Sequence, residues 1–207
     1  MWVVKLGGSL AQSPRLQGWL KALAEHGAGR AVIVPGGGPF ADMVRAEQAR
    51  ARFRDNAAHA MAILAMEQFG FMLAGLNPDL CVAAAEPELR GALANGRVPV
   101  WLAYPMIIRD STLPQDWSVT ADSLALWLAI RLKAEALLLV KSATLPDGPA
   151  DMGSLSTSGA LDSHFPVLAR QFGGELRWLN SGDSQLLKEG LAQGKLPGQP
   201  VLSGEKK

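Results

Sequence analysis

Near the start of the chain, a short hydrophobic run ends in a lysine and two glycines: Trp2-Val3-Val4-Lys5-Leu6-Gly7-Gly8-Ser9. An apolar run of this length, followed by a glycine turn, is typical of a buried β-strand. If a helix follows the turn, the free backbone amides and the helix N-terminus attract an anion. The stretch therefore predicts a strand that ends at a phosphate-binding turn, although a purely structural turn would also explain a single glycine pair.

A second glycine turn follows another hydrophobic run, in Val32-Ile33-Val34-Pro35-Gly36-Gly37-Gly38. Three successive glycines are hard to explain by turn geometry alone, because a Cβ is excluded only where the backbone is left-handed or closely approached. No lysine and serine or threonine follow in the Walker pattern. Gly36, Gly38 and Ala41 match a dinucleotide fingerprint, but an apolar segment from Ala57 stands where the required acid is expected.

Two further residues complete a candidate catalytic set. Lys141 ends the run Leu137-Leu138-Leu139-Val140, and Asp122 stands at the start of an apolar helical pattern. An aspartate between Lys5 and Lys141 would orient both ammonium groups toward a phosphate. Alternatively, each lysine is a strand-end residue that reaches into water, and Asp122 is a first-turn acid favoured by the helix dipole.

Strand and helix patterns alternate along the chain, which predicts βαβ units and a mainly parallel sheet. The expected strands span residues 2–6, 31–35, 80–84, 98–102, 135–140, 176–179 and 199–202. The expected helices span residues 14–26, 39–53, 56–76, 86–95, 120–133, 163–172 and 183–193. We predict an α/β fold in which helices cover both faces of the sheet, as one domain of 207 residues with a soft lobe boundary near 113–118 and a long loop over 142–159.

The composition excludes several classes of function. The 20 basic and 19 acidic residues nearly cancel, so no nucleic-acid partner is expected. Apolar windows are interrupted by Glu67 or Arg131, so no membrane span is expected, and no secretory signal pattern is present. The single cysteine, Cys81, is compatible with the cytoplasm. Residues 57–74 are apolar on nearly every face, which predicts either a central helix of a monomer or a helix buried by a second copy in a homodimer or larger homo-oligomer.

Taken together, these motifs resemble the amino acid kinase superfamily, which includes acetylglutamate, aspartate, uridylate and isopentenyl phosphate kinases. The resemblance covers essentially the whole chain, and its motifs are the Lys5–Ser9 stretch, the Gly36–Gly38 turn, Thr120-Ala121-Asp122 and the strand that ends at Lys141. It implies a three-layer αβα sandwich and phosphoryl transfer from ATP with Mg²⁺, to which the protein itself contributes few or no metal ligands. The acceptor lobe would be N-terminal and the nucleotide lobe C-terminal.

The resemblance also implies roles for individual residues. Lys5, Asp122 and Lys141 would be catalytic, and the Gly36, Gly37 and Gly38 turn would bind the acceptor. The nucleotide would be bound by Gly7, Gly8, Ser9, Ser142, Asp147, Gly148, Asn180 and Gly182.

Three segments look like the branch that phosphorylates [5-(aminomethyl)furan-3-yl]methyl phosphate in methanofuran synthesis: residues 55–62, 113–123 and 161–166. This similarity implies a small-molecule phosphate acceptor. Arg54, Asp55 and His59 would flank its head group, and Trp101 and Trp117 would offer flat faces. Ordinary packing or solvation explains each of these residues as well. A carboxylate or another alcohol phosphate as acceptor, and a nucleotide-binding protein without turnover, are the alternatives.

Overall fold

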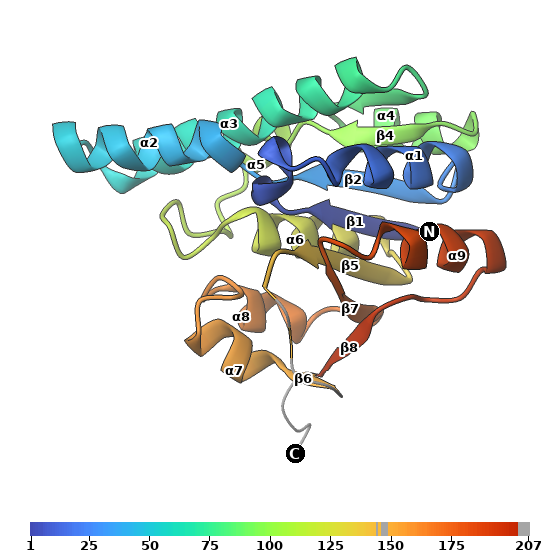
Figure 1. Ribbon diagram of the computed structural model, residues 1–207. Coiled ribbons are helices and arrows are strands. Elements are labelled where there is room, and N and C mark those ends of the chain that lie inside the picture. The colour runs from blue at the N-terminus through green and yellow to red at the C-terminus, as the bar shows by residue number, and fades with distance from the viewer. Residues whose placement is uncertain (144, 146–148, 203–207) are drawn as a thin grey trace.

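One sheet of eight strands organises the computed structural model, which describes residues 1–143, 145 and 149–202 (Figure 1). The strand order is β3-β4-β2-β1-β5-β7-β8-β6. The strands are β1 (Trp2–Leu6), β2 (Ala31–Pro35), β3 (Leu80–Ala83), β4 (Val98–Trp101), β5 (Ala136–Lys141), β6 (Ala150–Asp151), β7 (Glu175–Asn180) and β8 (Gln199–Leu202). Neighbouring strands are parallel except β7 and β8, so the prediction of a mainly parallel α/β sheet is confirmed.

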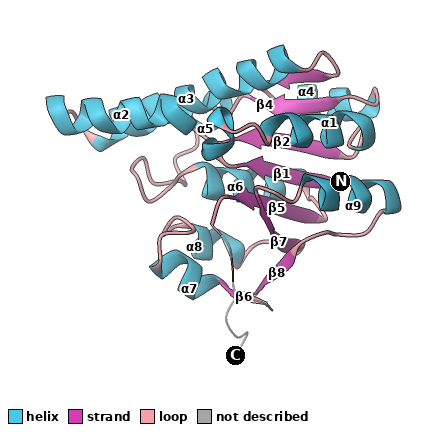
Figure 2. Cartoon of the chain, in the orientation of Figure 1, coloured by secondary structure: helices cyan, strands magenta, loops and turns pink. Residues whose placement is uncertain are grey.

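Helices cover both faces of this sheet (Figure 2). The helices α1 (Leu16–His26) and α9 (Ser184–Gln193) lie together on one face, and α6 (Ala121–Leu132) lies on the other. The remaining helical segments are η1 (Gly8–Gln12), α2 (Gly38–Ala51), α3 (Asp55–Leu76), α4 (Glu86–Ala94), α5 (Tyr104–Ile107), α7 (Met152–Thr157) and α8 (Phe165–Ala169).

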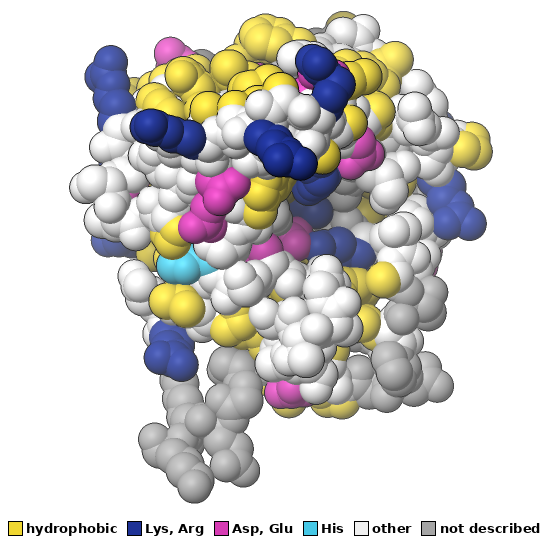
Figure 3. Space-filling model, turned by 90° about the vertical axis from the view of Figure 1, so that its left-hand side faces the viewer, with side chains coloured by type: hydrophobic (Ala, Val, Ile, Leu, Met, Phe, Trp, Pro, Cys, Tyr) yellow, Lys and Arg dark blue, Asp and Glu magenta, His cyan; other side chains and the backbone are white. Residues whose placement is uncertain are grey.

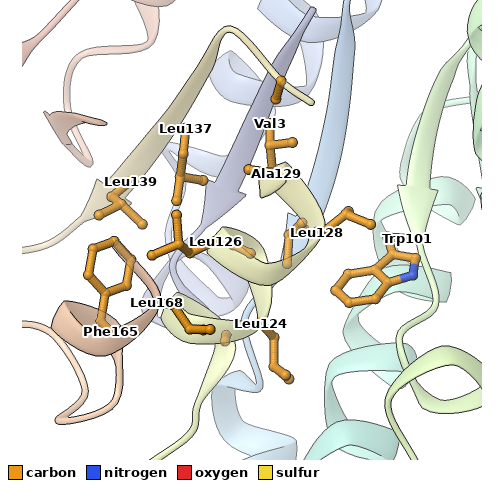
Figure 4. Close-up of a cluster of buried hydrophobic side chains, with 14 of the residues drawn as sticks. Val3, Trp101, Leu124, Leu126, Leu128, Ala129, Leu137, Leu139, Phe165 and Leu168 are labelled. Atoms are coloured by element: carbon orange, nitrogen blue, oxygen red, sulfur yellow. The ribbon is translucent and has the colours of Figure 1, made fainter. Parts of the chain in front are cut away.

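Alternate residues of the central strands supply the two hydrophobic layers, because successive strand side chains point to opposite faces. Val3 and Leu137 belong to the layer under α6, whereas Val4 and Leu138 belong to the layer under α1 and α9. Figure 4 shows the first layer, in which leucines of α6 meet Val3, Leu137 and Leu139. Truncating any of these buried leucines to alanine would cost about 2–5 kcal/mol.

Strand β1 is the point where the topology changes direction. It pairs with β2 on one side and with β5 on the other, so the chain leaves β1 toward one edge of the sheet and later returns beside it. In parallel sheets, ligands bind beyond the carboxyl ends of the strands at such a point. Lys5 and Gly7 stand at this end of β1, and Lys141 is the last residue of β5.

The structure differs from the predicted elements mainly after residue 141. The segment 142–159, expected to be one long loop, contains β6 and α7. Neither element has a periodic apolar pattern long enough to be recognised, because β6 has two residues and α7 has six. The helix expected over 163–172 is shorter, as α8, and η1 and α5 were not predicted.

Helix α3 is long and apolar enough to cross a membrane by length and composition alone. One side of it packs against β2, β3 and β4, and Phe69 and Leu73 are fully buried there. The side chains of Met61, Leu64 and Phe71 are exposed instead. Burial on the sheet explains one apolar face of α3, as in a core helix, and leaves a second apolar face at the surface.

Candidate active site

Strand geometry brings Lys5 and Lys141 to the same face of the sheet. Lys5 follows Val3 with a period of two along β1, and Lys141 follows Leu137 and Leu139 in the same way along β5. Val3, Leu137 and Leu139 all lie in the layer under α6, so both lysines face that helix. The register pairs Lys5 with Leu139, which places Lys141 one pleat further along the neighbouring strand.

Asp122, in the first turn of α6, contacts both lysines. Its Oδ1 lies 2.9 Å from Lys5 Nζ, and its Oδ2 accepts a short hydrogen bond from Lys141 Nζ. Lys141 Nζ also donates to the backbone carbonyl of Ala160 at 2.6 Å. Lys5 and Asp122 are only 5% and 4% exposed. The cluster therefore holds two ammonium groups and one carboxylate, with a net positive charge that is largely removed from water.

The pKa values follow from this arrangement. Burial would raise the pKa of Asp122, but the two ammonium groups outweigh it and hold that pKa below its ordinary value. Burial, together with repulsion from Lys5, lowers the pKa of Lys141 to about 8, against the opposing attraction of Asp122 and Asp162. At neutral pH Asp122 is thus ionised and most Lys141 side chains are charged.

The two glycine turns pack directly on each other beside this cluster. A Cβ on Gly8 would lie 2.3 Å from Gly38 N, and one on Gly36 would lie 2.5 Å from Gly8 N, so neither position has room for a side chain. Gly38 also has a φ of 54°, in the left-handed region. The amide groups of Gly7 and Gly36 donate to Val140 and Leu6 carbonyls.

The other amides of these turns are open. Within the described part of the chain, the N–H groups of Gly8, Gly37 and Gly38 have no hydrogen-bond acceptor. Gly8 begins η1 and Gly38 begins α2, so these amides stand at helix N-termini. Free amides at a helix N-terminus suit phosphate oxygens.

A cavity of about 540 Å³ lies beside the lysine cluster and the glycine turns. Its charged end is formed by Lys5, Asp122 and Lys141, and Gly8 and the Gly36–Gly38 turn line it as well. Figure 3 shows the side of the molecule where the strands end, with basic and acidic side chains lying within a hollow. A site that joins free amides, two ammonium groups and a cavity can hold a polyanion next to a second molecule.

The other end of the cavity is mostly apolar. Ile63 and Met66 of α3 line it together with Val119 and Leu124, and Trp117 and His59 complete the wall. His59 Nδ1 lies 3.2 Å from the carbonyl of Asp116, and its Nε2 is buried with no partner among the described residues. Burial lowers the pKa of His59 despite the nearby Asp116 carbonyl and carboxylate, so the imidazole is neutral at pH 7.

Trp117 is fixed from two sides. Its Nε1 donates to Gln48 Oε1 at 2.6 Å, and the Arg45 guanidinium lies 4.6 Å from the ring centroid. Arg45 also pairs with Asp42 at 2.8 Å, and both residues line the cavity. Sequence patterns did not single out Arg45 or Asp42, because they lie on an exposed helix face where charged residues are ordinary.

Three residues expected near the acceptor lie outside this cavity. Arg54 and Asp55 are exposed at the start of α3, where Asp55 accepts a hydrogen bond from Gln48 at 2.7 Å. Trp101 is fully buried and stacks on Trp127, with ring centroids 5.9 Å apart. Of the five named head-group residues, the structure brings only His59 and Trp117 to the cavity wall.

The expected nucleotide residues fall into two groups. Gly7, Gly8 and Ser9 follow β1, where Gly7 is buried and Ser9 is exposed. Ser142, Asn180 and Gly182 meet at the adjacent ends of β5 and β7: Asn180 Nδ2 donates to the Ser142 carbonyl at 3.4 Å, and Gly182 N donates to Asn180 Oδ1 at 3.1 Å. Asp147 and Gly148 lie outside the described residues.

No group of three or more His, Cys, Asp or Glu side chains within residues 1–143, 145 and 149–202 could hold a metal ion. The same region supplies ammonium groups and free amides for phosphate oxygens.

Known proteins resemble this chain in sequence and in fold. Residues 1–143 match the model of the amino acid kinase family. The [5-(aminomethyl)furan-3-yl]methyl phosphate kinase of Methanocaldococcus jannaschii is 26% identical over 187 residues, which cover 83% of this chain and 84% of that protein.

Two solved structures share the fold. The uridylate kinase of Archaeoglobus fulgidus has a TM-score of 0.72 at 15% identity, with 97% of this chain and 99% of that one covered. An isopentenyl phosphate kinase has a TM-score of 0.65 at 20% identity, with 98% and 100% covered.

Proposed function

This chain belongs to the amino acid kinase family, and we propose that it transfers the γ-phosphoryl group of MgATP to [5-(aminomethyl)furan-3-yl]methyl phosphate, giving the diphosphate. The observation that carries the proposal is the buried cluster in which Lys5 and Lys141 share the single carboxylate of Asp122 beside two glycine turns. A bound phosphoryl group would neutralise the excess positive charge of this cluster. The acceptor identity rests on the similarity to the furan phosphate kinase.

Phosphoryl transfer needs little covalent chemistry from the protein, because charge develops on the equatorial oxygens of the transferred group. In our proposal, the ammonium groups of Lys5 and Lys141 donate hydrogen bonds to those oxygens, and Asp122 keeps both lysines in place. Lys141 donates one N–H to Asp122 and one to the Ala160 carbonyl, so its third N–H remains for a phosphate. Preorganised charge of this kind is worth more in a water-poor site than in solvent.

The two substrates would enter from opposite sides of the cluster. We assign the nucleotide phosphates to Gly7, Gly8 and Ser9, and the rest of the nucleotide to the ends of β5 and β7, at Ser142, Asn180 and Gly182. The acceptor phosphate would lie at the open amides of Gly37 and Gly38. A furan ring would then lie against Ile63, Met66 and the other apolar residues of the wall. Magnesium bound to ATP would offset the charge of the phosphates.

A second copy of the chain is the proposed partner for the exposed face of α3. Met61, Leu64 and Phe71 form this face with exposures of 40%, 41% and 56%. Side chains of this size gain stability when they are removed from water. The proposed enzyme is thus a homodimer or larger homo-oligomer, and its single free cysteine, Cys81, suits a cytoplasmic location.

An acceptor panel tests the proposed reaction. Purified protein with MgATP would be given the furan phosphate, its dephosphorylated alcohol, isopentenyl phosphate, UMP and N-acetylglutamate, with ADP release and ³¹P NMR as measurements. Diphosphate formation with the furan phosphate alone supports the proposal. Turnover with another acceptor refutes the acceptor assignment but is consistent with phosphoryl transfer from ATP. ATP binding without turnover of any acceptor refutes the proposal that the protein is a kinase.

A further inference from the structure

Asp162, which lies in the segment between α7 and α8, gathers an unusual number of hydrogen-bond donors. Its Oδ2 accepts from Thr120 N at 2.9 Å, Thr120 Oγ1 at 2.8 Å and Ser123 N at 3.0 Å. Its Oδ1 accepts from Ser123 Oγ and from Phe165 N, the latter at 3.0 Å. One carboxylate therefore satisfies donors from the first turn of α6 and from the start of α8.

The α6 contacts are those of a helix cap supplied from elsewhere in the chain. Thr120 is the N-cap residue of α6, but its own side chain makes no capping bond, and its hydroxyl donates to Asp162. Asp162 accepts the hydrogen bond from the Ser123 N–H. In most helices, the side chain of the N-cap residue itself accepts from the amide at this position. Since Asp122 lies between Thr120 and Ser123, the carboxylate of Asp162 holds the backbone on both sides of Asp122.

Asp162 also contributes to the surroundings of Lys141. Asp162 is two positions after Ala160, whose carbonyl accepts from Lys141 Nζ. The charged groups around that ammonium are Asp122 from α6, Lys5 from β1 and Asp162 from the α7–α8 segment, and the ring of Trp178 from β7 lies 5.8 Å from Nζ. Asp162 thus binds the backbone on both sides of Asp122, one partner of Lys141, and lies two residues from Ala160, whose carbonyl is the other.

We propose that Asp162 is a positioning residue of the reaction, which sets the place of Asp122 and, through Asp122, that of Lys141. This inference rests on the proposed phosphoryl transfer only for its kinetic consequences. Its electrostatic part is independent of turnover: without the charge of Asp162, the pKa of Lys141 should fall below its value of about 8.

Asp162→Asn tests the inference, because asparagine keeps the shape and removes the charge. The amide nitrogen of the asparagine is a donor, so it also cannot accept the hydrogen bonds that one of the two Asp162 oxygens accepts. We expect kcat to fall by about tenfold, for the loss of a hydrogen-bonded charge, and the alkaline fall of kcat/KM to move to lower pH. In the free protein, ¹³C NMR of the lysine Cε carbons should show Lys141 titrating at lower pH, with Lys141→Met identifying the resonance.

Asp151→Asn is the matched control. Asp151 is the N-cap of α7 and accepts from Ser154 N at 2.7 Å, but it does not line the cavity. It should reduce the melting temperature without moving kcat or the pH profile. If Asp162→Asn behaves like this control, with kcat within twofold and the Lys141 titration unmoved, Asp162 is a structural cap and the inference is overturned.

A milder variant covers the case in which Asp162→Asn does not fold. Ser123→Ala removes one donor to Asp162 and leaves its charge, so kcat should fall several-fold at an unchanged Lys141 titration; an unchanged kcat overturns the inference. Failure of the proposed function is distinct, because the wild-type protein would then show no turnover at all while the NMR titration would still report the influence of Asp162 on Lys141.

Discussion

The two ends of the cavity are built by opposite means. At the charged end, Lys5, Asp122 and Lys141 are held by ion pairs, and each has a partner on a different element. At the apolar end, Ile63 and Met66 are placed by core packing, and His59 and Trp117 are fixed to neighbouring segments by hydrogen bonds. Charge stabilises a transition state, whereas an apolar wall selects the molecule that fits. The charged end should therefore control rate and the apolar end the choice of acceptor.

Asp122→Asn should produce the largest change, because it leaves two ammonium groups buried without a counter-charge. Removing one partner from a buried ion pair costs about 3–5 kcal/mol of unfolding free energy, which corresponds to a melting temperature lower by on the order of 10 °C. Calorimetry at several pH values measures this fall in melting temperature.

The loss should depend on pH in a defined direction. Lys141 already has a folded pKa of about 8, below its ordinary 10.5, so its charged form is the one that folding disfavours. Without Asp122 this penalty grows, and it disappears as Lys141 loses its proton. Stability of the variant should recover as pH rises toward and beyond 8. Asp42→Asn, at an exposed pair with Arg45, should change the melting temperature little at any pH; an equal loss in both variants would contradict the buried cluster as the cause.

Lys5→Met should separate rate from stability. The remaining Lys141 and Asp122 form a neutral pair, so the melting temperature should fall less than in Asp122→Asn. The turnover number should nevertheless fall by about 10²–10³, which is typical for removal of one donor to a developing anion. Steady-state kinetics with both substrates measures the change. Lys21→Met, at an exposed lysine of α1, is the control, and a Lys5→Met rate within about tenfold of wild type, or 1.4 kcal/mol, would exclude Lys5 from catalysis.

The charged end could be predicted from sequence to a large extent. Lys5 and Lys141 each end a hydrophobic run, and strand periodicity places each on the same side as the apolar residue two positions before it. Asp122 stands at the start of an apolar helical pattern, so its place in a first helical turn could also be predicted. Residues whose position follows from local periodicity and from the parallel order of strands need no long-range information.

The contacts that hold the site together could not be predicted in this way. Asp162 caps α6 from 42 residues away from Thr120, and no local pattern marks an aspartate as the cap of a distant helix. The same limit applies to His59, whose partner Asp116 lies 57 residues away, and to the Ala160 carbonyl. The resemblance implied that Arg54 and Asp55 flank the acceptor, but at the start of α3 both side chains are exposed and lie outside the cavity.

His59→Asn should produce the smallest of these changes and should confine it to the apolar end. The imidazole fills part of the cavity wall, and its Nδ1 lies within hydrogen-bonding distance of the Asp116 carbonyl next to Trp117. Loss of one such bond costs about 1 kcal/mol, so the KM for the acceptor should rise about fivefold while the KM for ATP stays constant. His26→Asn, in the last turn of α1, should change neither constant. Equal increases in both KM values would mean that His59 acts on the fold as a whole, and the division of the cavity into a rate-setting end and a selecting end would then have to be abandoned.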